Sequence, residues 1–155
     1  MLETGLTPLH PDYLKVMRLR AAISAIMMFF VGAGIEVANE WLPMGAVAGP
    51  VGVLAIVWAW VIPKRRFRRK GFAMGEDRLR IVSGFLFYRD TVVPFGRVQH
   101  LDVLAAPLER PWHLATLVLH TAGTHNFSVS LPGLKHEEAV AMREAIRSHI
   151  KREMA

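Results

Sequence analysis

The sequence predicts a membrane α-helical hairpin followed by a cytoplasmic α+β domain. Three observations support this prediction: two apolar runs before residue 63, a series of short alternating segments after it, and one amphipathic segment near the C-terminal end. The chain has 155 residues, 52% of them hydrophobic, and a formal net charge of +6. Its mean hydropathy of +0.28 is atypical of soluble basic proteins that bind nucleic acid.

The first apolar run is LRAAISAIMMFFVGAGIEV, from Leu19 to Val37. A helix of about 20 residues crosses a hydrocarbon core of roughly 30 Å, and this run has that length. A cleaved signal peptide is the alternative, but the preceding segment is long and a second apolar run follows closely. We therefore predict a membrane-spanning helix here.

The second apolar run is LPMGAVAGPVGVLAIVWAWVI, from Leu42 to Ile62, and it contains no charged residue. Its prolines and glycines would weaken a helix in water but are tolerated in a membrane. Glycine and alanine residues spaced four apart would let the two helices approach closely. We predict a helical hairpin whose connection lies near Ala38–Trp41.

Charges that flank the two runs predict the orientation of this hairpin. Lys15, Arg18 and Arg20 precede the first run and a basic cluster follows the second, whereas the connection has only Glu36 and Glu40. Because flanking Lys and Arg stay on the cytoplasmic side, both termini should be cytoplasmic. The predicted segments are a cytoplasmic N-terminal segment (1–18), the two-helix transmembrane hairpin (19–62) and a cytoplasmic domain (63–155).

The excess positive charge of the chain lies in one cluster after the second run. Its members are Lys64, Arg65, Arg66, Arg68, Arg69 and Lys70. Without these six of the 19 Lys and Arg, 13 remain against 13 Asp and Glu. We interpret the cluster as the stop-transfer anchor of the second helix, held electrostatically at the surface of the lipid bilayer. No helix-turn-helix, zinc or RNA-binding signature accompanies it, so we predict no nucleic-acid partner.

Short segments rich in β-branched and aromatic residues follow the cluster. The predicted strands are Phe67–Met74, two strands on either side of Ser83–Gly84 within 78–95, one strand in 98–106, and two strands that flank Ala122–Gly123 within 116–131. Successive short strands with short turns indicate an antiparallel sheet rather than βαβ units.

The segment LKHEEAVAMREAIRSHIKRE, residues 134–153, predicts an amphipathic helix after the last strand. Its apolar residues fall on one face at helical spacing. They are Ala139, Met142, Ile146 and Ile150. Acidic residues in its first turn and basic residues in its last turn complement the helix dipole.

Three stretches carry a family resemblance: VPFGRVQHLDVLAAPLERPWHLATLVLHTAG at 93–123, LPGL at 131–134 and EEA at 137–139. Together they resemble the bacterial PH-like domain of YdbS-like membrane proteins. The resemblance implies a PH-like fold, in which a bent antiparallel sheet forms a partly open barrel capped by a C-terminal helix. It also implies that the chain is integral to the bacterial inner membrane.

The same resemblance implies candidate contacts to a partner or a lipid headgroup. These are Arg97, Gln99, Arg110, Trp112 and His113. His113 stands where the family pattern has glycine, the residue that adopts positive φ most easily. The alternative is structural: either arginine would pair with a nearby acid or with backbone carbonyls, and Trp112 would cover the end of the barrel.

The residues give little support for catalysis or metal binding. No nucleophile elbow, phosphate-binding loop or zinc-protease motif is present, and the chain has no cysteine. His100 and Asp102 share one face of a predicted strand, and His120 and His125 flank a predicted turn, but such pairs usually lie on ordinary polar surfaces. We therefore expect no catalytic residue, no metal site and no cofactor.

The sequence thus predicts a non-catalytic binding or scaffold module that is anchored in the membrane. We expect it to assemble with a membrane protein that carries related PH-like domains, or with further copies of itself. The alternative is a protein that binds a lipid or small molecule at the cytoplasmic face of the membrane.

Overall fold

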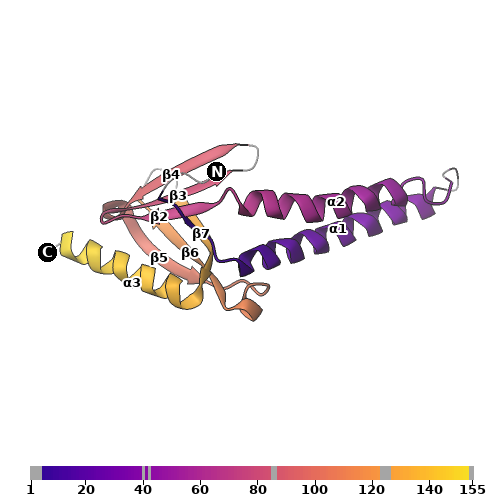
Figure 1. The fold of residues 1–155 in the computed structure, drawn as a ribbon. Coiled ribbons are helices and arrows are strands. Elements are labelled where there is room, and N and C mark those ends of the chain that lie inside the picture. The colour runs from indigo at the N-terminus through magenta and orange to yellow at the C-terminus, as the bar shows by residue number, and fades with distance from the viewer. Residues whose placement is uncertain (1–4, 40, 42, 85–86, 123–126, 154–155) are drawn as a thin grey trace. The chain divides into compact units, whose positions relative to one another are not determined.

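The computed structural model describes residues 5–39, 41, 43–84, 87–122 and 127–153 (Figure 1). Packing divides the chain into two compact units, one of residues 14–65 and the other of residues 1–13 together with 66–155. The elements are β1 (Thr7–Pro8), α1 (Asp12–Ala38), α2 (Ala48–Phe67), β2 (Gly71–Met74), β3 (Arg78–Gly84), β4 (Tyr88–Pro94), η1 (Phe95–Arg97), β5 (Val98–Leu104), η2 (Arg110–Trp112), β6 (Leu114–Thr121), β7 (Phe127–Lys135) and α3 (His136–Glu153).

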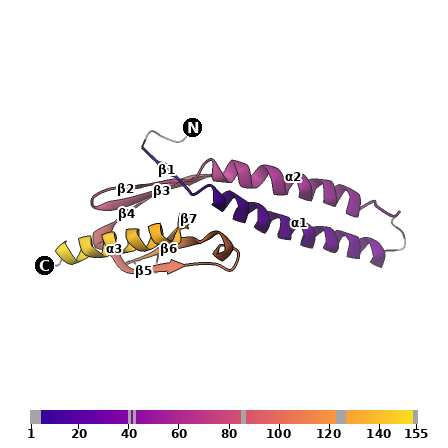
Figure 2. The same cartoon turned by 60° about the horizontal axis from the view of Figure 1, so that its bottom comes forward.

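The unit of residues 14–65 is built from α1 and α2, which lie side by side (Figures 1 and 2). Small residues bring them together, because a Cβ added to Gly32 or to Gly52 would lie 3.4 Å from a side chain of the opposite helix. The guanidinium of Arg18 lies 5.7 Å from the centre of the Trp60 ring, which pairs the start of α1 with the later part of α2. Two helices therefore form where two apolar runs were predicted.

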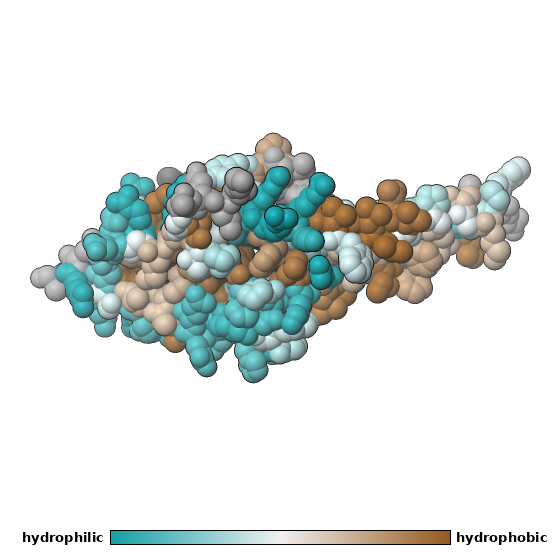
Figure 3. All heavy atoms as spheres, viewed as in Figure 1, coloured by the Kyte–Doolittle hydropathy of each residue, from teal (hydrophilic) through white to brown (hydrophobic). Residues whose placement is uncertain are grey.

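Apolar side chains cover much of the outer surface of α1 and α2 (Figure 3). Among the described residues, the helix long and apolar enough to cross a membrane is α1. The first predicted span thus coincides with a suitable helix. The second span stays a prediction, since α2 starts at Ala48 and extends into the basic cluster as far as Phe67.

The other unit contains two antiparallel sheets. Strands of the first follow the order β1-β2-β3-β4, and strands of the second the order β5-β6-β7. Phe72 pairs with Ile81 in the first sheet, and Leu119 pairs with Val129 in the second. The antiparallel arrangement confirms the prediction, although the strands divide into two sheets where one bent sheet was expected.

Helix α3 covers the second sheet and closes the core of this unit. Ala139, Met142 and Ile146 are buried, as their spacing predicted, and the ring of His149 meets that of Phe95 at 5.5 Å. The most deeply buried large side chains of the unit come from both sheets, η1 and α3. They are Leu79, Phe95, Leu114, Leu117, Leu119, Leu131, Leu134 and Ile146.

Several predicted boundaries are wrong. The helix expected from Leu134 starts at His136, because β7 continues through Lys135. The strand expected from Phe67 starts at Gly71, because α2 continues through Phe67 and closes with a hydrogen bond from the Lys70 amide to the Phe67 carbonyl. The turn expected at Ser83–Gly84 is still part of β3. The strand expected to end at Leu131 continues as β7 through Pro132 and Gly133, because proline is tolerated on an edge strand.

The N-terminal residues belong to the sheet-containing unit. Thr7 and Pro8 pair with β2, and the His10 amide donates a 2.8 Å hydrogen bond to the Gly133 carbonyl. Tyr13 is buried against Gly133, whose φ is +76°. This strand was not predicted, since two residues that include proline carry no strand pattern.

Candidate functional site

The loop between β5 and β6, residues 105–113, is held by a buried acid. Glu109 is 2% exposed, and it is the buried charged residue in the part of the chain that the structure describes. Its Oε2 accepts hydrogen bonds from the Ala106 amide (3.3 Å) and the Thr116 hydroxyl (3.4 Å). The Glu109 carbonyl also accepts a hydrogen bond from the Leu114 amide at 3.1 Å. One residue therefore fixes both sides of the loop.

His113 ends this loop in the left-handed conformation, with φ 53° and ψ 38°. Its amide donates to the Arg110 carbonyl at 3.0 Å, and its carbonyl accepts from the His136 amide at 3.0 Å. Glycine adopts this backbone most easily, and here the backbone carries an imidazole side chain. His113 thereby joins the loop to the first residue of α3.

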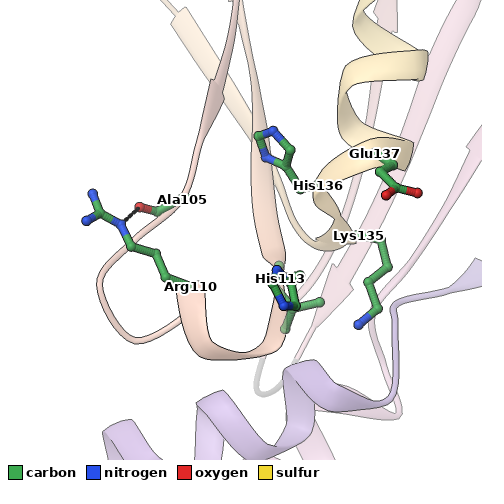
Figure 4. A pocket seen from close by; sticks show the side chains of 7 residues that line it. Ala105, Arg110, His113, Lys135, His136 and Glu137 are labelled. Atoms are coloured by element: carbon green, nitrogen blue, oxygen red, sulfur yellow. Dashed lines mark hydrogen bonds between the residues drawn. The ribbon is translucent and has the colours of Figure 1, made fainter.

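A cleft of about 630 Å³ opens between this loop and the start of α3 (Figure 4). We call it the loop cleft. Its lining residues are Ala105, Arg110, His113, Leu114, Lys135, His136 and Glu137. Among the described lining residues, the two cations Arg110 and Lys135 outnumber the carboxylate of Glu137, so the cleft favours anionic groups.

Both cations of the loop cleft are held by backbone oxygen atoms. Arg110 Nε donates to the Ala105 carbonyl at 3.4 Å (Figure 4), and Lys135 Nζ donates to the Trp112 carbonyl at 3.0 Å. Lys135 Nζ also lies 3.4 Å from an oxygen of Asp12. The contact of Arg110 is the kind expected of a structural arginine, but its exposed guanidinium still has donors for a ligand.

A second concavity of about 440 Å³ lies between the start of β5 and the second half of α3. We call it the β5–α3 groove. Its lining residues are Val98, Gln99, His100, Leu101, Arg143, Arg147, Ile150 and Lys151. Its helix wall carries three cations spaced four residues apart, which places them on one side of α3.

The structure divides the predicted contact residues among three places. Arg110 and His113 line the loop cleft, with the Trp112 carbonyl beside them, and Gln99 lines the β5–α3 groove. Arg97 lines a third concavity of about 260 Å³, between the end of β4 and the β6–β7 strand pair. These five residues are therefore not one site, and their role as contacts stays a prediction.

The sequence pattern did not lead to a prediction for the three cations of α3 in the groove. The signal was present, since Arg143, Arg147 and Lys151 repeat every four residues. Such a row on a helix is usually a solvated face. Only the packing of α3 beside β5 turns it into one wall of a groove.

Asp102 connects two histidines on the outer face of the second sheet. Its two oxygens lie 3.0 Å from His100 Nε2 and 3.2 Å from His120 Nε2. The shared face of His100 and Asp102 was predicted. His125, the other histidine considered as a metal ligand, lies outside the described residues. No group of three or more His, Asp or Glu in the described residues is arranged to hold a metal ion.

The hairpin β2–β3 turns at residues 75–77, directly after the predicted end of a strand at Met74. Hydrogen bonds from Arg78 lower the pKa of Asp77, and hydrogen bonds from Arg80 in the same way lower the pKa of Asp90. Arg78 Nε donates to Asp77 at 2.8 Å, and Arg80 Nε donates to Asp90 at 3.0 Å. Both arginines are therefore engaged by acids and offer little to an anionic ligand.

The basic cluster spans the end of α2 and its connection to β2. Lys64, Arg65 and Arg66 lie in the last turns of α2, and Arg68 to Lys70 follow it. Lys70 Nζ lies 5.7 Å from the centre of the Tyr13 ring, a distance typical of a cation–π contact. The basic cluster thus extends from the last turns of α2 to the residue before β2.

Comparisons with known proteins agree with the resemblance seen in the sequence. The sequence model of the bacterial PH domain family matches residues 19–150. The UPF0699 transmembrane protein YdbS of Bacillus subtilis is 32% identical over 151 residues, which cover 94% of this chain and 93% of that protein. A crystal structure of a DUF1696 family protein with a pleckstrin-homology domain, from Shewanella loihica, aligns with 55% of this chain and with 74% of the chain in that crystal structure. The two sequences are 19% identical, and the TM-score is 0.42.

Proposed function

The chain belongs to the bacterial PH domain family, and from this premise we propose that it is a membrane-anchored binding module without catalytic activity. Its sheet-containing unit, residues 1–13 and 66–155, is called the PH-like unit below. This unit would recruit a partner at the cytoplasmic face of the bacterial inner membrane. The partner would be a membrane protein with related PH-like domains or a second copy of this chain. The main observation in support of this proposal is that cations line both the loop cleft and the β5–α3 groove, each of which is built from separate elements of the PH-like unit.

The proposed anchor is the hairpin of α1 and α2, with two spans and both termini in the cytoplasm. Large apolar side chains are exposed along both helices, and in water such a surface would favour aggregation. The contact between Arg18 and Trp60 supports a common cytoplasmic end for the two helices, since basic and aromatic residues favour that interface. The basic cluster would follow at the same end.

A binding role fits the way in which the polar groups are used. Glu109 and His113 hold backbone groups of the 105–113 loop, so their polar groups are used to fix the loop. Cations with few carboxylate neighbours line the concave surfaces. Such an arrangement favours recognition of acidic groups over chemistry on them.

The test is photocrosslinking of the full-length chain in its native membranes. A photoreactive residue replaces Arg110 in one variant and Gln99 in another, and mass spectrometry identifies the adducts. A further variant carries the same residue at Glu138, which is exposed on α3 and lines neither concavity, as the control. Adducts to a defined membrane protein or to a second copy from the first two positions are expected, and their absence would contradict the binding role.

The second candidate is binding of an anionic lipid or small molecule, favoured by the cations of the loop cleft. Arg110, His113, Lys135 and His136 surround a space large enough for a phosphate-bearing headgroup. Adducts to lipid alone from position 110 would favour this function. Native mass spectrometry of the chain released from nanodiscs would then show a retained lipid that Arg110→Ala removes.

A further inference from the structure

Strand β5 lies at the edge of its sheet. The order is β5-β6-β7, and the described residues give β5 no neighbour other than β6. From His100 to Leu104 its pairing with β6 is regular, and a bulge lies at Gln99. In an antiparallel pair, alternate residues of an edge strand direct their amide and carbonyl groups away from the partner strand. These groups of β5 can pair with an added strand.

The β5–α3 groove lies beside the first four residues of this edge strand, Val98 to Leu101. Helix α3 packs against β5, as both ribbon views show (Figures 1 and 2). Ile150 and Leu101 are half-buried in its lining, and Val98 is buried. An added strand would therefore rest on an apolar floor while its backbone pairs with β5. Every second side chain of such a strand would face α3.

The helix wall of the groove is cationic. It presents Arg143, Arg147 and Lys151, and no acidic side chain is among the described lining residues. Arg143 pairs with Glu144 at 2.8 Å, whereas no carboxylate of the described chain lies within ion-pair distance of Arg147 or Lys151. The groove is thus charged in a way that selects an acidic segment.

The spacing of the cations matches that of a strand. Four residues of α-helix advance about 6.0 Å along the axis. Two residues of β-strand advance about 6.6 to 6.8 Å. Carboxylates at every second position of an added strand would consequently stand opposite Arg143, Arg147 and Lys151 in turn.

We propose that the β5–α3 groove receives an extended acidic segment of a partner protein, added as a strand to β5 with its alternate carboxylates against the cations of α3. This inference rests on the proposed binding function and specifies the chemistry of the partner. The residues between these carboxylates would face the outer side of the sheet, where Asp102 lies. Asp102 would repel an acid there, so acids should alternate with uncharged residues along the added segment.

The first experiment measures peptide binding to the full-length chain in phosphatidylcholine nanodiscs. The probe is a labelled ten-residue peptide in which glutamate alternates with threonine, and the control has the same composition with its glutamates in one block. The alternating peptide should bind at least about fivefold more tightly. Equal affinities, or no binding of the alternating peptide, would overturn the proposal.

Backbone pairing is tested with two N-methylated forms of the alternating peptide. One form is methylated at the odd positions and the other at the even positions, so that one of them blocks the amides that face β5. One form should lose binding and the other should keep it. If both forms bind like the parent peptide, strand addition is wrong.

Charge reversal locates the site on the chain. The double variant Arg147→Glu/Lys151→Glu should weaken peptide binding by at least about tenfold, since two favourable contacts become repulsive. The matched control Arg89→Glu/Arg152→Glu changes the net charge equally at exposed positions outside the groove, and it should stay within about twofold of the wild type. Similar losses in both would exclude a groove-specific site.

The photocrosslinking variants distinguish this inference from the proposed function. In the chain with a photoreactive residue at 99 and no other change, the crosslinked segment of the partner should be acidic. When Arg147→Glu/Lys151→Glu is added to this chain, the adduct to the partner should disappear. An adduct that persists, or a crosslinked segment without acids, would contradict the proposal that the groove receives an acidic segment. The proposed binding function would not be contradicted. If the chain without charge reversal gives no protein adduct from position 99 or position 110, both the groove proposal and the proposed binding function are contradicted.

Discussion

Gly133 and Tyr13 share a contact that leaves no room for a side chain on the glycine: an added Cβ would lie 2.7 Å from Cγ of Tyr13. The contact joins β7 to the start of α1, and a hydrogen bond from the His10 amide to the Gly133 carbonyl lies beside it. The LPGL stretch that carries part of the family resemblance is therefore one of the places where the N-terminal residues attach to the PH-like unit, together with β2.

Replacing this glycine should destabilise the PH-like unit strongly. Gly133→Ala adds a steric overlap with Tyr13 to the strain of a φ of +76°, and together these cost about 2–4 kcal/mol. Thermal unfolding of the full-length chain in detergent measures the change. Gly5→Ala is the matched control, because Gly5 has a φ of +113° with nothing within 4 Å of its Cβ position and should lose only about 1 kcal/mol. Equal losses would mean that contact with Tyr13 is unimportant.

Removal of the buried carboxylate at 109 should open the loop between β5 and β6. Glu109→Ala leaves the Ala106 amide and the Thr116 hydroxyl without their acceptor, at a cost of about 2–3 kcal/mol. Glu109→Gln retains an acceptor oxygen and should lose less. Chemical denaturation reports the stability, and Glu144→Ala, at an exposed position of α3, serves as the control. A Glu109→Ala variant as stable as the control would contradict this account of the loop.

A substitution at 113 should stabilise the chain. His113→Gly removes the strain of a left-handed backbone, which is worth about 1 kcal/mol. The same exchange at His136, in the first turn of α3, should instead destabilise by up to about 1 kcal/mol, since glycine weakens helices. Opposite shifts of the melting temperature are the expected result, and a loss of stability in both variants would show that the imidazole of His113 contributes packing that outweighs the strain.

Acid should weaken the pairing of β3 with β4. Because Arg80 lowers the pKa of Asp90 in the folded chain, the stabilisation from this pair is fully present above the unfolded pKa of about 4 and is lost as the pH falls through the lowered folded value. Asp90→Asn should therefore have a lower melting temperature than the wild type at pH 7. The difference should shrink below about pH 4. A difference that is the same at pH 7 and pH 3 would have another cause.

Much of the fold could be predicted because its pattern is local. The alternation in β7 and the face formed by Ala139, Met142 and Ile146 depend only on neighbouring residues, and both are present. The pairing of Thr7–Pro8 with β2 could not be predicted, since it depends on contacts with residues far away in the sequence, such as Gly133. Pro132 and Gly133 likewise indicated the end of a strand. They are tolerated within β7 because this strand lies at the edge of its sheet, which the sequence alone does not show.

The candidate sites were harder to predict for the same reason. Arg110 and His113 could be identified from the family pattern, but Lys135 and His136 join them only through the fold. The left-handed backbone of His113 could be suspected only from the glycine that the resemblance has at this position, because the local residues do not predict it. The cations of α3 were visible as a row, whereas their position across from the free edge of β5 is a tertiary property.

The end of α1 and the start of α2 are joined by a single carboxylate. Glu36 accepts hydrogen bonds from the amides of Gly45, Val47 (3.2 Å) and Ala48 (3.0 Å), the last of which is the first residue of α2. In the proposed topology this carboxylate lies at the tip that must pass through the bilayer during biogenesis. A charge already solvated by three amides crosses hydrocarbon at a lower cost than a bare one. We therefore expect the two helices to insert together as a preformed hairpin rather than one after the other.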